Sequence, residues 1–382
     1  MTETGSKTAL IAMSGGVDSS VAAHLMKEAG YDCMGVTMNL YRKDEIGYAG
    51  SRVCCSRKDI DDAGIVAYQM GMPFEVLDYT EEFKECIINK FIRTYEAGGT
   101  PNPCIDCNRY MKFSKLLDFA RSRGLNYVVT GHYAQIRFNE ETGRYELLKA
   151  VDKSKDQSYV LYSLTQDQLA HTQFPLGGMT KDETRKVAGA NGFVNAHKRD
   201  SQDICFVPDG DYVRFMEDFT GKVYPDGKFI DEDGNVLGDS RNAVKYTTGQ
   251  RKGLGIAMGR PVYVTRKDME ANTVTLGDEP ALFHRGLLAE DMNWISIPEL
   301  TAPIRVKAKV RYRQTEQPAT AYPVRSADGT LTRERVKVVF DEPQRAITTG
   351  QALVLYDGEV VVGGGTITGL VPDSEADAVQ TE

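Results

Sequence analysis

The stretch Ser14-Gly15-Gly16-Val17-Asp18-Ser19-Ser20 decides the fold that we expect for this chain. It follows the apolar run 9–12, which is typical of a buried parallel strand, and it opens a segment whose apolar residues have helical spacing. Its glycines allow the backbone to approach an anion closely, and hydroxyl and N–H groups at a helix start can hold a phosphate. No Gly-Lys-Ser/Thr follows, so the pattern is not that of a Walker loop. The stretch predicts a phosphate-binding strand–loop–helix, with an ordinary Ser/Gly-rich turn as the alternative.

Strand and helix patterns alternate over the next 130 residues or so, which predicts an α/β fold with a doubly wound parallel sheet. From residue 209 the sequence is rich in glycine and turn signals, and from about residue 280 it consists of short alternating strands typical of a β-barrel or sandwich. We therefore expect an α/β domain over 1–208, a central domain over 209–279 and a β-barrel or sandwich domain over 280–371. The acidic end, 372–382, is expected to be disordered.

The composition limits the possible functions of the 382 residues. The formal net charge of −8 does not suggest a general nucleic-acid binder, so any polyanion must meet a local concentration of cations. No apolar run approaches the roughly 20 residues that span a bilayer, and the polar start lacks the apolar core of a signal peptide. We expect a cytoplasmic protein with no membrane partner, and we interpret its seven cysteines as thiols, cluster ligands or catalytic groups.

One predicted strand carries such a concentration of cations. Arg305, Lys307, Lys309, Arg311 and Arg313 occupy every second position, with apolar residues between them, so a strand would place all five cations on one face. This face is the best candidate for contact with a phosphate backbone. The alternative is a solvated face that nearby acids neutralise.

The cysteines form a second constellation. Cys104 and Cys107 make a Cys-x-x-Cys in what we interpret as a proline-broken loop between helices, and Cys205 lies in another predicted loop. A redox pair, a zinc half-site and iron–sulfur ligands all fit this spacing, although zinc is disfavoured because a structural site usually needs four Cys or His ligands. The pattern does not decide the role of Cys54 and Cys55. His132 follows a predicted strand end, where either a nucleotide contact or simple packing is possible.

Motifs along almost the whole chain carry a family resemblance. The sequence resembles the tRNA-specific 2-thiouridylases of the MnmA (TrmU) type, which belong to the ATP-pyrophosphatase, or PP-loop, superfamily. The resemblance implies a PP-loop domain like that of the adenine nucleotide alpha hydrolases, a small central domain and a C-terminal β-barrel. The matching stretches are 13–20, 99–103 with Cys107-Asn108, 112–113, 130–133, 155–159, 200–201 with 204–206, 248–256, 311–314 and 363–365.

The resemblance also implies a reaction. ATP, with Mg²⁺, would adenylate the C2 oxygen of the wobble uridine of tRNA and release pyrophosphate. A persulfide on Cys205 would then deliver sulfur, and Cys107 would be the nucleophile that completes the transfer, forming a disulfide with Cys205 as AMP leaves. The implied partners are tRNAs with wobble-uridine anticodons, those for Lys, Glu and Gln, and a persulfide donor such as a cysteine desulfurase or a sulfur-relay protein.

The resemblance assigns contacts residue by residue. ATP would be bound by Ala12, Met13, Ser14, Gly15, Gly16, Val17, Asp18, Ser19, Met38 and Gly131. The target base would meet Asn102, Pro103 and Cys104. The tRNA would be contacted by Lys155, Asp156, Gln157, Arg311 and Tyr312.

One departure from the family pattern concerns Cys104. The better-known members carry an Asp there, thought to assist proton transfer, so an acid/base role at this position is in doubt. Cys104, Cys107 and Cys205 could instead converge on a four-iron (4Fe-4S) cluster, as in related tRNA thiolases. Two rival functions are weaker: no glutaminase signature supports an amidotransferase, and a tRNA-binding or sulfur-relay protein without catalysis needs no pyrophosphate loop.

Overall fold

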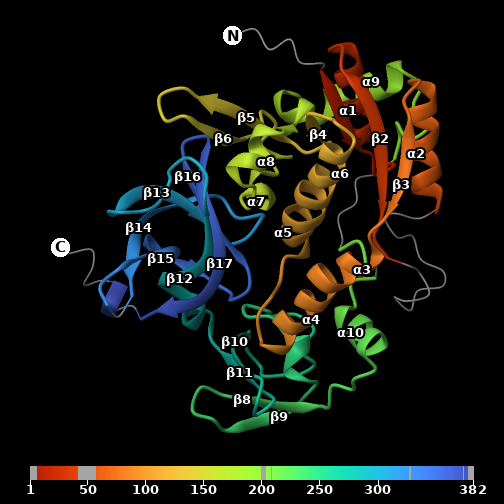
Figure 1. Ribbon diagram of the computed structural model, residues 1–382. Helices are drawn as coiled ribbons and strands as arrows, with labels where there is room; N and C mark the ends of the chain where they lie inside the picture. The colour runs from red at the N-terminus through yellow and green to blue at the C-terminus, as the bar shows by residue number, and fades with distance from the viewer. Residues whose placement is uncertain are drawn as a thin grey trace. The chain divides into compact units, whose positions relative to one another are not determined.

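The computed structural model describes residues 7–41, 57–198, 204–207, 209–326, 328–372 and 374–376. The chain divides into two compact units (Figure 1). The first comprises Met1–Ile88, Pro103–Tyr212 and Glu359–Val361, and the second comprises Asn89–Asn102, Val213–Gly358 and Val362–Glu382. The predicted residues Cys54, Cys55 and 199–203 lie outside the described part of the chain.

A parallel sheet organises the first unit, as predicted. Its strand order is β3-β2-β1-β4-β7, and every neighbouring pair is parallel. Strand β1 lies at the centre because its apolar run is buried on both faces: Leu10 and Ile11 are fully buried. The strands are β1 (Thr8–Ala12), β2 (Asp32–Asn39), β3 (Phe74–Asp78), β4 (Tyr127–Val129) and β7 (Thr172–Gln173).

Helices cover both faces of this sheet (Figure 1). On one face, buried residues of α1, α2 and α9, such as Val21, Val66 and Ala188, form a core with β1 and β4. On the other face, Leu116 and Ala120 of α6 pack against Leu10 and Val128. The helices of this unit include α1 (Val17–Glu28), α2 (Arg57–Gln69), α3 (Thr80–Phe83), η1 (Lys84–Ile88), α6 (Leu116–Ser122), α7 (Ser158–Leu161), α8 (Gln166–Ala170), η3 (Pro175–Gly178) and α9 (Lys181–Ala190).

The segment that carries Cys104 and Cys107 corrects a prediction. It is helical: α5 (Pro103–Asp106) runs into the π-helix η2 (Cys107–Lys115) and then into α6. Proline is tolerated at the first turn of a helix, where its missing N–H has no intrahelical partner. Pro103 therefore starts this helix, whereas the sequence pattern indicates that it breaks one.

A hairpin in the first unit was not anticipated. Strands β5 (Ala134–Asn139) and β6 (Arg144–Lys149) pair antiparallel around a turn that contains Gly143, whose φ is +63°. The alternation that identifies such strands is weak here, because Glu146 and Lys149 are buried polar residues. Polar burial of this kind hides a strand from a hydrophobic pattern.

The second unit begins with the helical segment α4 (Asn89–Glu96) and contains a small sheet and a barrel. The small sheet has the order β10-β11-β8-β9 and its own core around Phe229, Val264 and Val274. Its strands are β8 (Gly227–Ile230), β9 (Val236–Ser240), β10 (Tyr263–Asp268) and β11 (Thr273–Gly277), joined by η4 (Ala243–Lys245) and followed by η5 (Glu279–Leu282). The helix α10 (Tyr212–Thr220) lies in a segment for which only strands and turns were predicted.

The barrel confirms the predicted C-terminal architecture. Strands pair in the order β12-β15-β14-β13-β16-β17, and an additional pairing of β12 with β17 closes the ring. Its interior contains Trp294, Phe340 and Leu355. The strands are β12 (Phe283–Trp294), β13 (Ile304–Lys309), β14 (Gln317–Arg325), β15 (Leu331–Arg345), β16 (Ala352–Asp357) and β17 (Val360–Val371).

Two expectations for this unit need correction. Strand β13 ends at Lys309, so Arg311 and Arg313 lie beyond the strand, where the chain turns and Arg311 donates a hydrogen bond to the carbonyl of Arg345. The predicted disorder after residue 371 does not extend to 374–376, which are helical, because Ala376 is fully buried against the barrel. Residues 377–382 lie outside the described residues. Within the described part of the chain, no helix is long and apolar enough to cross a membrane.

Candidate functional site

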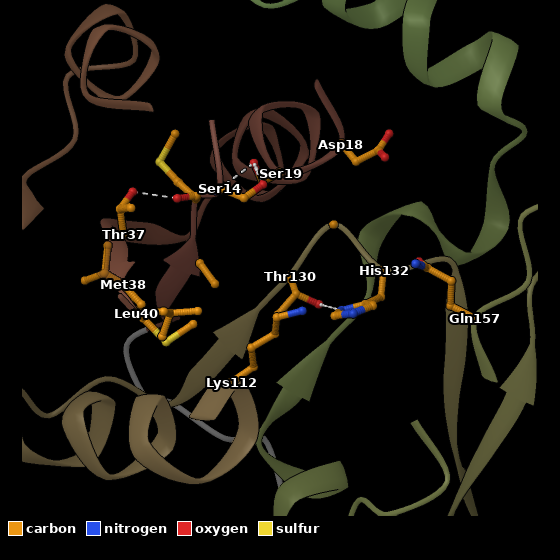
Figure 2. A pocket seen from close by; sticks show the side chains of 14 residues that line it. Ser14, Asp18, Ser19, Thr37, Met38, Leu40, Lys112, Thr130, His132 and Gln157 are labelled. Carbon is orange, nitrogen blue, oxygen red and sulfur yellow. Dashed lines mark hydrogen bonds between the residues drawn. The ribbon is translucent and has the colours of Figure 1, made fainter. Parts of the chain in front are cut away.

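A pocket lies at the carboxyl ends of β1, β2 and β4, where open α/β sheets bind ligands. Figure 2 shows polar side chains from several elements turned toward this space. The residues that line it are Ala12, Met13, Ser14, Asp18, Ser19, Val36, Thr37, Met38, Leu40, Lys112, Thr130, Gly131, His132 and Gln157.

The loop between β1 and α1 forms one wall of the pocket. Gly16 is the N-cap of α1 and has no side chain that could cap the helix. The hydroxyl of Ser19 accepts a hydrogen bond from the backbone N–H of Ser14 at 3.2 Å, which ties the loop to the first turn of the helix. The first N–H groups of any helix lack intrahelical partners. The start of α1 is therefore suited to an anion.

Two side chains from the segment after α9 hold this loop in place by hydrogen bonds to its backbone. The amide of Asn195 donates to the Gly15 carbonyl at 3.2 Å, and the Lys198 ammonium donates to the same oxygen at 2.9 Å. In a trans peptide the carbonyl and the next N–H point in opposite directions. Holding the Gly15 carbonyl in this way therefore directs the N–H of Gly16 to the opposite side of the loop.

Lys198 itself is held by carboxylates. It pairs with Asp59 and, at 3.1 Å, with Asp62, both on α2. Burial lowers the pKa of Lys198, but its hydrogen bonds to these two acids outweigh burial and hold the pKa above its usual value. Lys198 is therefore positively charged at neutral pH while it holds the loop.

Asp18 sits in a second network at the edge of the loop. Its carboxylate accepts from the Lys181 ammonium at 2.7 Å and from the Tyr133 hydroxyl at 3.0 Å, and that hydroxyl also lies 3.0 Å from the hydroxyl of Thr184. The Lys181 side chain is only 9% exposed. An ion pair shielded from water in this way fixes the first turn of α1 against α9 more firmly than an exposed pair would.

The opposite wall contains a neutral histidine. His132 Nδ1 lies 2.6 Å from the Thr130 hydroxyl, and the imidazole packs on Phe113 and Phe174. Burial lowers the pKa of His132 well below its usual value, and the positive charge of Lys112 lowers it further. The two possibilities left by the sequence are thus combined, because His132 is a packed, uncharged residue that also lines the pocket.

Cys107 and Lys112 lie on the same π-helix, η2. In an α-helix, residues five apart point about 140° away from each other, whereas the i→i+5 bonding of a π-helix stacks them more nearly over one another. Burial raises the pKa of the Cys107 thiol to about 11, and Lys112 opposes this rise. Because Lys112 also lines the pocket, one ammonium group acts on both the pocket and the thiol.

The Cys205 segment attaches to the same end of the sheet. The Tyr41 hydroxyl, two residues beyond β2, donates to the Cys205 carbonyl at 3.0 Å. Phe206 packs on Phe83, with ring centroids 5.7 Å apart. Cys104 is exposed, while Cys107 and Cys205 are partly exposed.

Comparison with known proteins agrees with this geometry. The family described as "tRNA methyl transferase HUP domain" matches residues 7–209, the "tRNA methyl transferase PRC-barrel domain" matches 214–278, and the "Aminomethyltransferase beta-barrel domain" matches 284–367. The tRNA-specific 2-thiouridylase MnmA of Acetivibrio thermocellus is 49% identical over 94% of this chain and 99% of its own length. That of Clostridioides difficile is 48% identical over 94% of this chain and 98% of its own length.

The chain belongs to the tRNA-specific 2-thiouridylase family. Membership covers all three parts of the chain, because both relatives align over nearly their full lengths.

The structure brings together most of the nucleotide contacts that the thiouridylase resemblance assigns. Seven of them line the pocket, while Gly15, Gly16 and Val17 form the turn behind it. Gln157, which was assigned to tRNA, also lines the pocket and accepts a hydrogen bond from the Tyr133 N–H at 2.9 Å. The residues of the first group are Ala12, Met13, Ser14, Asp18, Ser19, Met38 and Gly131.

Other assigned residues are distributed over both units. Pro103 and Cys104 open α5 in the first unit, whereas Asn102 belongs to the second. Asp156 accepts from the Ala150 N–H at 3.0 Å, which gives it a structural bond in the turn that also carries Lys155. Tyr312 is 38% exposed in the second unit.

Sequence reasoning missed four polar residues at this site: Lys112 as a pocket residue, and Lys181, Asn195 and Lys198 as supports of the loop. The last three are about 160 to 180 residues away from the loop in sequence. Isolated lysines and asparagines at such separations form no local motif. Only Lys112 was signalled, as part of the matched Lys112-Phe113 pair.

Among the described residues, which include Cys104, Cys107 and Cys205, no group of three or more His, Cys, Asp or Glu side chains is arranged to hold a metal ion. This result concerns the ligands of a single ion, whereas the cysteines of a four-iron cluster bind different irons, so the cluster stays a prediction.

Proposed function

We propose that this chain is an ATP-dependent tRNA 2-thiouridylase that activates the wobble uridine at C2 and replaces its oxygen with sulfur. The observation that supports this best is the position of Lys112, which lines the phosphate-loop pocket and acts on the Cys107 thiol. One side chain thereby connects the proposed nucleotide site with the proposed catalytic thiol. Family membership supports the same substrate and reaction.

In the first step, the phosphates of ATP would lie at the start of α1. The N–H groups of the loop, directed by the Asn195 and Lys198 brace, would bind the leaving pyrophosphate. Asp18 is held by Lys181, so Mg²⁺ would be bound mainly by phosphate oxygens, and its role would be to neutralise their charge. Attack of the uridine O2 on the α-phosphorus would break the bond to pyrophosphate and leave an adenylated O2.

In the second step, the terminal sulfur of a Cys205 persulfide would bond to C2. The Cys107 thiolate would then attack the Cys205 sulfur, so that the sulfur–sulfur bond breaks, AMP leaves with the O2 oxygen, and a Cys107–Cys205 disulfide forms. A thiol reductant would restore both cysteines. Lys112 would favour the thiolate of Cys107 and the negative charge of AMP at the same moment.

Cys104 has no part in this scheme as an acid or a base. Its exposed thiol lies at the start of α5 beside Pro103, where the target base is proposed to bind. A four-iron cluster on Cys104, Cys107 and Cys205 gains no support from the arrangement of donors, and we route no step through one. The proposed partners remain tRNAs with wobble uridine, those for Lys, Glu and Gln, and a persulfide donor in the cytoplasm.

Nucleoside mass spectrometry tests the function directly. Unmodified tRNA is incubated with the full chain, ATP, Mg²⁺, a cysteine desulfurase and cysteine, and 2-thiouridine is measured at the wobble position. We expect 2-thiouridine only when ATP is present. Its absence from tRNA under these conditions, with a donor known to form persulfides on the chain, would refute the proposal.

The Cys205→Ser variant separates activation from sulfur transfer. It should retain ATP and tRNA binding and give no thiolated product, because only the sulfur carrier is lost. Cys33→Ser is the matched control, since Cys33 is buried in the core of the first unit and away from the pocket lining. Thiolation by Cys205→Ser at the wild-type rate would show that the sulfur carrier is misassigned.

A further inference from the structure

The motif Thr248-Gly249-Gln250-Arg251-Lys252 and its glycine-rich continuation to residue 256 have no role in the scheme above. They form the connection between η4 and β10 in the small sheet domain of the second unit (Figure 1). Arg251 and Lys252 are both exposed. Within the described part of the chain, neither of these two side chains forms an ion pair.

The loop holds a defined conformation. Gln250 closes it on both sides: its side-chain oxygen accepts from the Thr247 N–H at 3.1 Å, and its amide donates to the Lys252 carbonyl at 3.0 Å. Gly249, Gly253 and Gly255 all have positive φ, between +74° and +85°. Leu254 is 7% exposed and anchors the tip in the domain core. Two adjacent cations are thus presented on a loop whose backbone is held by these contacts, so binding has to order only the two side chains.

A third cation lies under the loop. The Lys267 ammonium donates to the Tyr246 carbonyl, just before the loop, at 2.8 Å. Burial lowers the pKa of Lys267 to about 8, so the ammonium form still predominates at pH 7. The loop and its base therefore concentrate positive charge on a chain whose net charge is −8.

The base of the loop also touches the segment that holds Arg311. A Cβ at Gly249 would lie 2.7 Å from the Cβ of Ala346, so the loop packs directly on this segment. Arg311 donates to the carbonyl of Arg345, the neighbouring residue, at 2.8 Å. All of these residues belong to the second unit. The loop therefore packs on the same segment as Arg311, the residue assigned to tRNA contact.

We propose that the loop 247–256 is a second site for the RNA phosphate backbone, with Arg251 and Lys252 as its contacts, next to Arg311. This inference rests on the proposed function, because it takes tRNA as the polyanion. Phosphate contacts position a nucleic acid without reading its sequence. The site would therefore set the register of the tRNA on the second unit and would not select its anticodon.

The test is the salt dependence of tRNA binding by the full chain, measured between about 50 and 200 mM salt. Each phosphate contact contributes about 0.7 to 0.9 to the slope of log affinity against log salt. The double variant Arg251→Ala/Lys252→Ala should lower the slope by about 1.4 to 1.8, with unchanged ATP binding. The double variant Arg251→Lys/Lys252→Arg keeps both charges and should keep the slope.

The matched control is Lys222→Ala/Lys228→Ala, which removes two exposed cations from the same unit. These lysines are already paired with Glu96 and Asp239, so the slope should barely change. An unchanged slope in the loop variant, or an equal fall in the control, would overturn the inference. Failure of the wild-type chain to bind tRNA at all would instead contradict the proposed function itself.

Discussion

Cys107 combines two opposing influences on its reactivity. Burial raises its pKa to about 11, which keeps the thiol protonated at neutral pH, while Lys112 acts in the other direction. The thiolate is the reactive form of cysteine. Burial therefore disfavours the reactive form of Cys107 at neutral pH, and the charge of Lys112 favours it.

The alkylation rate of Cys107 should report this balance. Because its pKa lies near 11, the thiolate fraction and the rate should rise about tenfold per pH unit between pH 7 and 9. Lys112→Met removes the opposing charge and should lower the rate at each pH in this range. The measurement is peptide-resolved mass spectrometry after brief iodoacetamide treatment of the full chain.

Lys115→Met serves as the control for this experiment, since Lys115 lies on the same π-helix but pairs with Glu82 at 3.3 Å. It should leave the Cys107 rate unchanged. A rate that levels off below pH 9, or an equal effect of both lysine variants, would contradict this account of the thiol.

At the level of elements, local sequence predicted the parallel sheet well and the cysteine helix poorly. The apolar run of β1 identifies the first strand without further information. The helix from Pro103 to Ser122 was divided incorrectly, because proline can either end a helix or begin one. A π-helix has no sequence signature that single-chain reasoning can use, so the alignment of Cys107 with Lys112 was inaccessible.

The phosphate loop shows how much of a site depends on distant elements. Its glycines and serines were predicted from seven consecutive residues, but its conformation depends on α2 and on the segment after α9. Gly15 has φ of +70°, and a Cβ there would lie far inside van der Waals contact with the backbone carbonyl of Asp59. The loop therefore requires glycine for two reasons, conformation and close approach.

Gly15→Ala should reduce ATP affinity by more than tenfold, because an added Cβ must displace either the loop or the start of α2. The measurement is ATP binding by isothermal titration calorimetry, with circular dichroism to verify the fold. Gly143→Ala is the matched control: its φ is +63°, but open space surrounds its Cβ position. Both variants place an alanine in the left-handed backbone region, which costs each of them roughly 1–2 kcal/mol of stability. If both bind ATP like the wild type, the close approach has no role in the loop.

For the whole molecule, the problem is how an acidic chain binds an acidic polymer. The sequence suggested that a five-cation strand solves it, but the structure distributes these cations differently. Arg305 donates to both carboxylate oxygens of Asp341, at 2.8 and 2.7 Å. A nearby acid therefore neutralises the charge of this residue, which is the alternative that the sequence left open. Arg311 lies beyond the strand and donates a hydrogen bond to the carbonyl of Arg345 at 2.8 Å. Alternation alone could not distinguish these cases, because it gives the face of a residue and not its partners.

This difference makes a prediction about tRNA binding by the intact chain. Arg311→Ala should lower the slope of log affinity against log salt by about one, because one phosphate contact is lost. Arg305→Ala removes the same charge from the same segment and should leave the slope nearly unchanged, since Asp341 already neutralises that guanidinium. Both slopes can be measured by fluorescence anisotropy of labelled tRNA. Equal slopes for the two variants would mean that the tRNA displaces Asp341 from Arg305, and the acidic partner would then be a competitor that screens the strand until RNA binds.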